Sequence, residues 1–293
     1  MKIHKHIPSN KPRQVTFNKS PIIRRHIINA NAVTTDKTLE INTNIVQVDK
    51  IKIAVYSCNI GNYRNEFSNY FNAILDKNID YFLFTDKTLN NEERSKLSNW
   101  NVCNIDALPS DEIMNDNRWT SKYIKFVLPE NLKNYDIVIW IDNKMFKPHH
   151  KINSMNYDDI VKLLKIKPNT LVFNIKHPDR KTIQEELRKT ISLNLENKIS
   201  GNFFLKYVKN YNSKFILVDT CFIIRKNNLT VNNAFEYCFN LLKKYKLKRD
   251  QNVYNYALDQ QNIKPFILDD LNDPINMDNK SPNSYARDPA FHL

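Results

Sequence analysis

A continuous apolar run that ends in a carboxylate constrains the fold of this chain more than any other feature. Ile137–Ile141 contains five consecutive apolar residues, and Asp142 follows directly. Such a run is typical of a strand that is covered on both faces. Strands of this kind belong to α/β sheets, whose ligands bind beyond the carboxyl ends of the strands. We therefore expect Asp142 to lie at the ligand-binding edge of a mostly parallel sheet.

A cationic helix is expected shortly before this strand. Arg118, Lys122 and Lys125 recur at i, i+4 and i+7, so a helix places them on one face. Aromatic side chains repeat the same spacing one residue later and are expected to pack inward: Trp119, Tyr123 and Phe126. Cations beside a strand-end carboxylate suit a diphosphate ligand. The structural alternative is a solvated basic face.

The rest of the chain alternates between strand and helix patterns. The expected strands cover residues 52–57, 80–85, 170–175, 215–224 and 265–268. The expected helices cover residues 67–75, 160–164, 183–195, 234–245 and 249–258, and residues 86–117 are expected to form a polar loop. This alternation predicts an α/β fold with a mostly parallel sheet flanked by helices.

Composition suggests three regions. The 293 residues contain 44 Lys and Arg against 31 Asp and Glu, and 41% are hydrophobic, which is enough for a sizeable core. Residues 1–48 lack sustained periodicity and are expected to form a basic, largely disordered arm suited to an anionic surface. Residues 49–271 are expected to fold as one domain, and residues 272–293 as an irregular tail.

Several classes of protein are disfavoured. The two glycines, Gly61 and Gly201, cannot form a glycine-rich phosphate loop, which argues against P-loop and dinucleotide-binding folds. The four cysteines form no Cys-x-x-Cys pair, so we expect reduced thiols in a cytoplasmic protein. No run of about 18 apolar residues occurs, so no membrane-spanning helix is expected.

An ordered set of short segments resembles a known family, the GT-A glycosyltransferase-like domains of unknown function in plant turgor- and mucilage-related proteins and bacterial capsule loci. It is also distantly similar to glycogenin-like transferases. In chain order, the matching segments are Ala54–Ser57 with Gly61–Tyr63, Asp80–Asp86 with Trp100, Arg118–Lys125, Trp140–Lys144, His177–Arg180 with Glu185 and Glu186, Asp219–Arg225, and Arg249–Gln251.

This resemblance implies a GT-A-like, Rossmann-like fold and a glycosyltransferase. Such an enzyme moves a sugar from a nucleotide-sugar donor, here a UDP-sugar, to a glycan or protein acceptor. GT-A enzymes usually place an Asp-x-Asp motif at the position of Asp142, where it holds a divalent cation against the diphosphate. Here Lys144 stands in place of the second Asp and is suited to neutralise phosphate directly. A metal ion, Mn²⁺ or Mg²⁺, on Asp142 remains an alternative, as does a role for Asp142 as a turn cap.

The resemblance also implies roles for other residues. Arg118 and Lys122 are expected to bind the diphosphate. Asp250 and Gln251 resemble the Asp-Gln segment that faces the donor sugar in glycogenin-like enzymes. The structural alternative for Asp250 is a helix N-terminal carboxylate.

Two further groups follow strand ends. The loops at these positions hold the base and ribose in GT-A folds, so the resemblance implies this role for Tyr56, Ser57 and Asp86, and core packing is the alternative for Tyr56. His177, Arg180 and Arg249 are expected to bind acceptor or phosphate, and a structural role is the alternative for His177.

Two other functions remain open. A plant member of the resembling family is described as a ceramidase, which suggests a lipid amidase, although the chain contains no nucleophile elbow and no His-rich zinc motif. A non-catalytic transferase fold that binds nucleic acid or a membrane surface is the other alternative.

Overall fold

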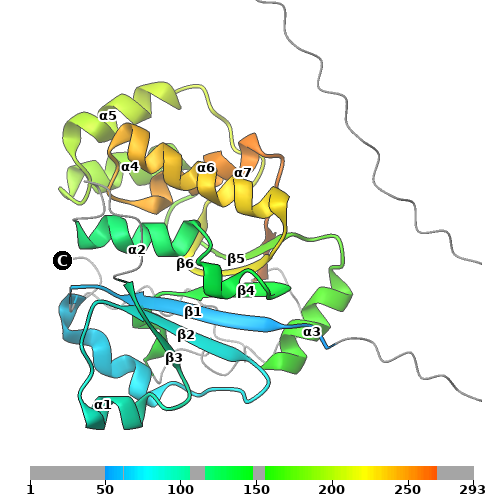
Figure 1. Ribbon diagram of the computed structural model, residues 1–293. Helices are drawn as coiled ribbons and strands as arrows, with labels where there is room; N and C mark the ends of the chain where they lie inside the picture. The colour runs from blue at the N-terminus through cyan, green and yellow to red at the C-terminus, as the bar shows by residue number, and fades with distance from the viewer. Residues whose placement is uncertain (1–49, 62, 106–115, 148–155, 269–293) are drawn as a thin grey trace, which may run out of the picture. The chain divides into compact units, whose positions relative to one another are not determined.

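The computed structural model describes residues 50–61, 63–105, 116–147 and 156–268. The arm over residues 1–48 and the tail over residues 272–293 lie outside these residues and stay predictions. Within them, a seven-stranded sheet in the order β3-β2-β1-β4-β6-β5-β7 forms the centre of the fold (Figure 1).

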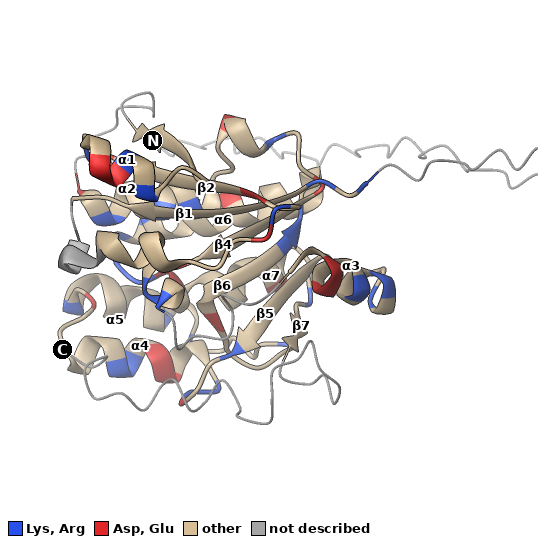
Figure 2. Ribbon diagram, turned by 90° about the horizontal axis from the view of Figure 1, so that it is seen from below, with Lys and Arg blue, Asp and Glu red and all other residues tan. Residues whose placement is uncertain are grey.

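The strands are β1 (Ile53–Asn59), β2 (Asp80–Thr85), β3 (Asn101–Asn104), β4 (Ile137–Ile141), β5 (Val172–Lys176), β6 (Val218–Lys226) and β7 (Phe266–Ile267). β3, β2, β1 and β4 pair in parallel, as do β5 and β7, whereas β6 runs antiparallel to both β4 and β5. Figure 2 shows β2, β1, β4, β6, β5 and β7 across the sheet. The expected α/β architecture with a mostly parallel sheet is confirmed.

Two apolar layers cover the sheet because successive side chains of a strand point to opposite faces. Ala54, Tyr56, Val138 and Trp140 pack against the helices on one face. Ile53, Val55, Ile137, Ile139 and Ile141 pack on the other face against the segments around η1 and α3.

The helices of the first face are α2 (Asn117–Phe126), α4 (Ile183–Ser192), α5 (Lys198–Tyr207), α6 (Leu229–Tyr245) and α7 (Tyr254–Gln260), which gather on one side in Figure 1. The remaining helices of the described residues are α1 (Asn91–Lys96), α3 (Tyr157–Ile166) and four 3₁₀ helices: η1 (Tyr63–Asn72), η4 (Glu130–Leu132), η5 (Asn143–Phe146) and η7 (Asp250–Asn252). No helix in the described ranges has the length and apolar character needed to span a bilayer.

The structure differs from expectation in three segments. Residues 67–75 do not form an amphipathic α-helix, because η1 is a 3₁₀ helix that ends at Asn72. With three residues per turn, Phe67 and Tyr70 share the buried face, while Ile74 lies beyond the helix and is exposed. The expected polar loop contains α1 and β3, whose polar sequences show no strong periodicity. Helix α5 was not expected at all, because apolar side chains lie on both of its faces.

Candidate active site

Strand directions bring distant residues to one edge of the sheet. β1, β2 and β4 are parallel, so their carboxyl ends lie together, and antiparallel β6 places its first residues beside the end of β4. The backbone N–H of Asp142 donates a 2.8 Å hydrogen bond to the carbonyl of Cys221. Asp142 therefore lies next to the start of β6, as expected for a strand-end carboxylate at this edge.

Asp142 is oriented by side chains from its own strand and from α2. Trp140 Nε1 donates to Asp142 Oδ1 over 2.6 Å, and Lys125 Nζ lies 3.6 Å from the same oxygen. The side chain caps no backbone N–H of η5, so it is not a turn cap. With 34% of its side chain exposed, the oriented carboxylate is accessible to a ligand.

The buried carboxylate of Asp250 binds two lysines of α2. Lys122 Nζ donates to Asp250 Oδ1 over 2.8 Å, and Lys125 Nζ donates to Asp250 Oδ2 over 2.6 Å. The two lysines are neighbours on the helix because they stand at positions i and i+3. Thr220 Oγ1 adds a 3.1 Å bond to Asp250 Oδ2. α2, β6 and η7 thus meet at a single carboxylate.

The charges in this cluster stabilise one another. Burial lowers the pKa of Lys125, but Asp142 and Asp250 outweigh it and raise the pKa above its ordinary value. Burial raises the pKa of Asp250, whereas Lys122 and Lys125 hold it well below its ordinary value. Lys125 and Asp250 are therefore both charged at neutral pH.

Lys144 and Asp219 form a second group of charges that interacts with Asp142. Burial lowers the pKa of Lys144, but Cys221, Asp219 and Asp142 raise it above the ordinary value. Asp219 Oδ1 accepts a 2.8 Å bond from the backbone N–H of Cys221. Burial raises the pKa of Asp219, but Lys144 and this N–H keep it below its ordinary value. The charge of Lys144 is therefore coupled to the carboxylates of Asp142 and Asp219, a coupling that the sequence could not indicate without the direction of β6.

Gln251 joins η7 to β6. Its Oε1 accepts hydrogen bonds from the backbone N–H and the hydroxyl of Thr220, both 3.2 Å long, and its Nε2 donates to the carbonyl of Val218. The amide that was expected to face the donor sugar is thus buried against the protein. Thr220 was missed as a site residue, because only strand pairing brings it to Asp250 and Gln251.

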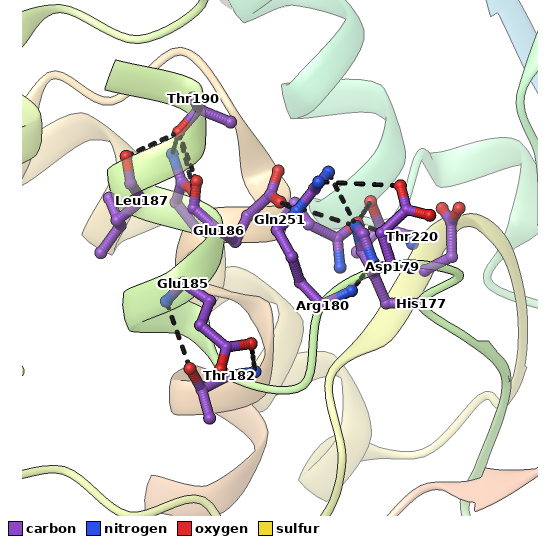
Figure 3. A network of polar contacts seen from close by, with 12 residues as sticks. His177, Asp179, Arg180, Thr182, Glu185, Glu186, Leu187, Thr190, Thr220 and Gln251 are labelled. Atoms are coloured by element: carbon purple, nitrogen blue, oxygen red, sulfur yellow. Dashed lines mark hydrogen bonds and ion pairs between the residues drawn. The ribbon is translucent and has the colours of Figure 1, made fainter. Parts of the chain in front are cut away.

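His177 and Arg180 belong to a tight turn after β5. His177 Nδ1 accepts from the backbone N–H groups of Asp179 and Arg180 over 3.2 and 3.1 Å, and burial lowers the pKa of the imidazole. Arg180 Nε donates to the buried carboxylate of Glu186 (Figure 3). Both side chains are committed to this network, which favours the structural alternative for His177.

Two other predicted arginines, Arg118 and Arg249, have exposed side chains. Arg118 is exposed and forms a 3.0 Å ion pair with Asp116, one turn before Lys122 on α2. Arg249 is exposed, its backbone N–H donates to Glu196 over 3.1 Å, and its charge lowers the pKa of Lys144. Their exposed positions suit contacts with a ligand.

Tyr56 and Ser57 do not fit a base-binding role. Tyr56 is fully buried, donates its hydroxyl to the carbonyl of Lys125 over 2.8 Å and accepts from Arg225 over 3.1 Å. Ser57 is also fully buried, 3.1 Å from the hydroxyl of Tyr70. Because neither side chain has exposed surface, a base cannot stack on Tyr56 in this structure, and the alternative of core packing describes it.

Asp86 is exposed at the end of β2. Its two carboxylate oxygens accept from the N–H of Gly61 over 3.0 and 2.8 Å. Gly61 has φ of +67°, a conformation that glycine adopts without strain, so this turn after β1 needs a glycine. Asp86 thus fixes the turn and stays accessible to a polar ligand.

The side chains near Asp142 do not fit a metal ion held by the protein. No group of three or more His, Cys, Asp or Glu side chains suited to a metal occurs in the described part of the chain. Asp142, the expected ligand, has the ammonium group of Lys125 3.6 Å from its oxygen and lies close enough to Lys144 to raise its pKa. These two positive charges disfavour a metal cation at Asp142.

Comparisons with known proteins identify no family for this chain. No family model matches it, and no curated protein matches it. Among solved structures, the apo form of the glycosyltransferase GlyE from Streptococcus pneumoniae is similar over 72% of this chain, with 10% identity and a TM-score of 0.37. The matched region spans 44% of that protein, which is less than half of its length.

Proposed function

We propose that this protein is a glycosyltransferase that uses a nucleotide-sugar donor, a UDP-sugar, and a glycan or protein acceptor. The proposal depends chiefly on Asp142, an accessible and oriented carboxylate at the carboxyl end of a central strand, with the buried ammonium group of Lys125 3.6 Å away. The ordered segments that resemble GT-A transferases support it. In this reaction the bond between the anomeric carbon and the diphosphate breaks, the acceptor oxygen bonds to that carbon, and the acceptor loses its hydroxyl proton.

Exposure separates the residues that can touch a ligand from those that support them. The exposed fractions of the side chains are 34% for Asp142 and 22% for Lys122, but 9% for Asp250 and 3% for Lys125. Asp142 is therefore assigned to a hydroxyl of the donor sugar, and Lys122 to the departing diphosphate. Asp250 and Lys125 are positioning residues: Asp250 holds Lys122, and Lys125 lies beside Asp142. Lys144 and Arg118 supply further positive charge for the diphosphate.

Binding of the donor is tested by thermal unfolding with a panel of nucleotide sugars. A ligand that binds only the folded state stabilises it by about 2.7 kcal/mol at one hundred times its Kd, which corresponds to a rise of several degrees in Tm. We expect UDP and at least one UDP-sugar to produce this rise equally with Mn²⁺ and with EDTA. If no nucleotide or nucleotide sugar shifts Tm at millimolar concentration, the proposal is wrong.

Arg118→Ala should weaken UDP binding about tenfold, because a charge-assisted hydrogen bond to phosphate contributes about 1.5–3 kcal/mol. Calorimetric titration with UDP measures the change, and added salt should weaken binding to the wild type in the same direction. Arg188→Ala, which removes another exposed arginine from α4, is the control and should bind UDP normally. An unchanged Kd for Arg118→Ala would place the diphosphate elsewhere.

A binding module without catalysis is the second candidate. One observation favours it: Asp250 already forms ion pairs with both Lys122 and Lys125, so these cations must weaken those pairs before they bind a phosphate. Such a protein would bind UDP-sugar in the thermal assay and release no UDP with any acceptor or with water. Release of UDP that depends on Asp142 distinguishes the enzyme from the binding module.

A further inference from the structure

Helix α5 presents a line of exposed apolar side chains. Ile199, Phe203 and Tyr207 are 82%, 63% and 50% exposed, and they recur at i, i+4 and i+8. This spacing places them along one face of the helix, which we call the α5 ridge. Single exposed apolar residues are common on protein surfaces, whereas a continuous row that includes aromatic rings marks an interaction surface.

The aromatic side chains of the α5 ridge pack against tyrosines of α6 and α7. The ring of Tyr245, at the end of α6, lies 5.7 Å from the ring of Phe203 and 5.2 Å from that of Tyr207. The hydroxyls of Tyr207 and Tyr256 are 3.1 Å apart, which ties the ridge to α7. The ring contacts also show that α5 and the end of α6 are neighbours.

Cations border this ridge. Residues 198–214 contain four lysines and no acidic residue, and residues 243–249 contain five Lys and Arg and no acidic residue. The exposed lysines among them are Lys198, Lys206, Lys209, Lys214, Lys243, Lys244 and Lys246. The ring contacts place Tyr245 beside Phe203 and Tyr207, so the lysines next to these rings in the sequence form a common positive border. Lys214 lies farther along the chain and is 3.9 Å from Asp259.

We propose that the α5 ridge and its lysine border dock this protein onto the surface of an anionic lipid bilayer. Apolar and aromatic side chains enter the boundary between headgroups and acyl chains, and lysines bind the negative headgroups around them. A partner protein of the usual kind suits this surface less, because lysine is depleted in protein–protein interfaces.

The docking surface connects directly to the candidate active site. Glu196, buried just before α5, accepts from the backbone N–H groups of Lys248 and Arg249 over 3.0 and 3.1 Å and from Asn252 Nδ2 over 3.0 Å. These bonds fix the start of α5 to η7, which carries Asp250. Docking through α5 would therefore hold the candidate site at a defined position relative to the bilayer.

Vesicle flotation of the full chain tests the proposal. Vesicles contain phosphatidylcholine alone or phosphatidylcholine mixed with phosphatidylserine. We expect binding to the mixed vesicles only, with at least about a tenfold lower partition coefficient for the double variant Ile199→Ser/Phe203→Ser, because the ridge no longer enters the boundary. Lys243→Gln/Lys244→Gln should weaken binding and reduce its dependence on salt.

The matched control is Ile166→Ser/Leu229→Ser, which also removes two exposed apolar side chains but from α3 and the start of α6. It should bind as the wild type does, and circular dichroism melts should show all variants folded. Normal binding of Ile199→Ser/Phe203→Ser would overturn the proposal and assign any binding to charges elsewhere in the chain. Failure of the wild type to bind mixed vesicles would overturn it too, and binding to RNA through the same lysines would then identify a nucleic acid as the ligand of this surface.

Discussion

Asp250→Asn is expected to destabilise the fold by about 3–5 kcal/mol, because removal of one partner leaves a buried charge uncompensated. Lys125 is almost fully buried, and in the variant its remaining carboxylate is Asp142, 3.6 Å away. Urea unfolding followed by circular dichroism measures the change. Asp116→Asn is the control: it breaks an exposed ion pair with Arg118 and should cost less than about 1 kcal/mol.

The double variant Lys125→Met/Asp250→Asn tests the cause of that loss. It removes the buried ammonium group together with its partner, so it should recover part of the lost stability. If the double variant is as unstable as the sum of the two single variants, Lys125 and Asp250 do not stabilise each other, and the electrostatic explanation is wrong.

The lowered pKa of Asp250 also predicts how the stability of the fold depends on pH. A carboxyl whose pKa is lower in the folded state than in the unfolded chain binds fewer protons when folded, so it stabilises the fold above about pH 3.9. That contribution is lost as pH falls further toward the folded-state pKa. Lys125, whose pKa is raised on folding, keeps its contribution until pH rises above about 10.4. The urea concentration at the midpoint of unfolding should therefore fall at both extremes of pH for the wild type. At the acid extreme it should fall less steeply for Asp250→Asn than for the wild type.

Asp142→Asn is expected to reduce glycosyl transfer a hundredfold or more, about 2.7 kcal/mol at the transition state. The amide keeps an oxygen that can accept from Trp140 but loses the negative charge that the ligand is proposed to meet. Stability should change little, since Lys125 retains Asp250 at 2.6 Å and the Asp142 side chain is accessible to solvent. The measurement is UDP release from the donor identified by thermal shift.

The control for this variant lies at the opposite end of the same strand. Asp136 is exposed, and its Oδ2 accepts from the backbone N–H of Lys52 over 2.8 Å, so Asp136→Asn should leave turnover unchanged. Normal turnover in Asp142→Asn would remove this residue from the reaction. Unfolding of Asp142→Asn would show that the carboxylate has a structural role instead.

Much of the fold could be predicted from local periodicity. The apolar run Ile137–Ile141 and the spacing of Trp119, Tyr123 and Phe126 placed β4 and α2 correctly, because a side chain's direction repeats with the period of its element. Helix α5 and the 3₁₀ helix η1 could not be predicted in this way. α5 has apolar residues on two faces, and η1 has three residues per turn instead of 3.6.

The sequence by itself determined which residue types stand at strand ends, and it identified Asp142, Lys122 and Asp250 as candidates. Only the tertiary structure decided which of them meet. Lys125 and Asp250 are 125 positions apart, and their contact depends on where α2 and η7 pack. The antiparallel direction of β6 brings Asp219 and Thr220 to the site, and packing buries Tyr56. Periodicity reports which face of an element is buried, whereas strand order and direction, which are nonlocal, select its partners.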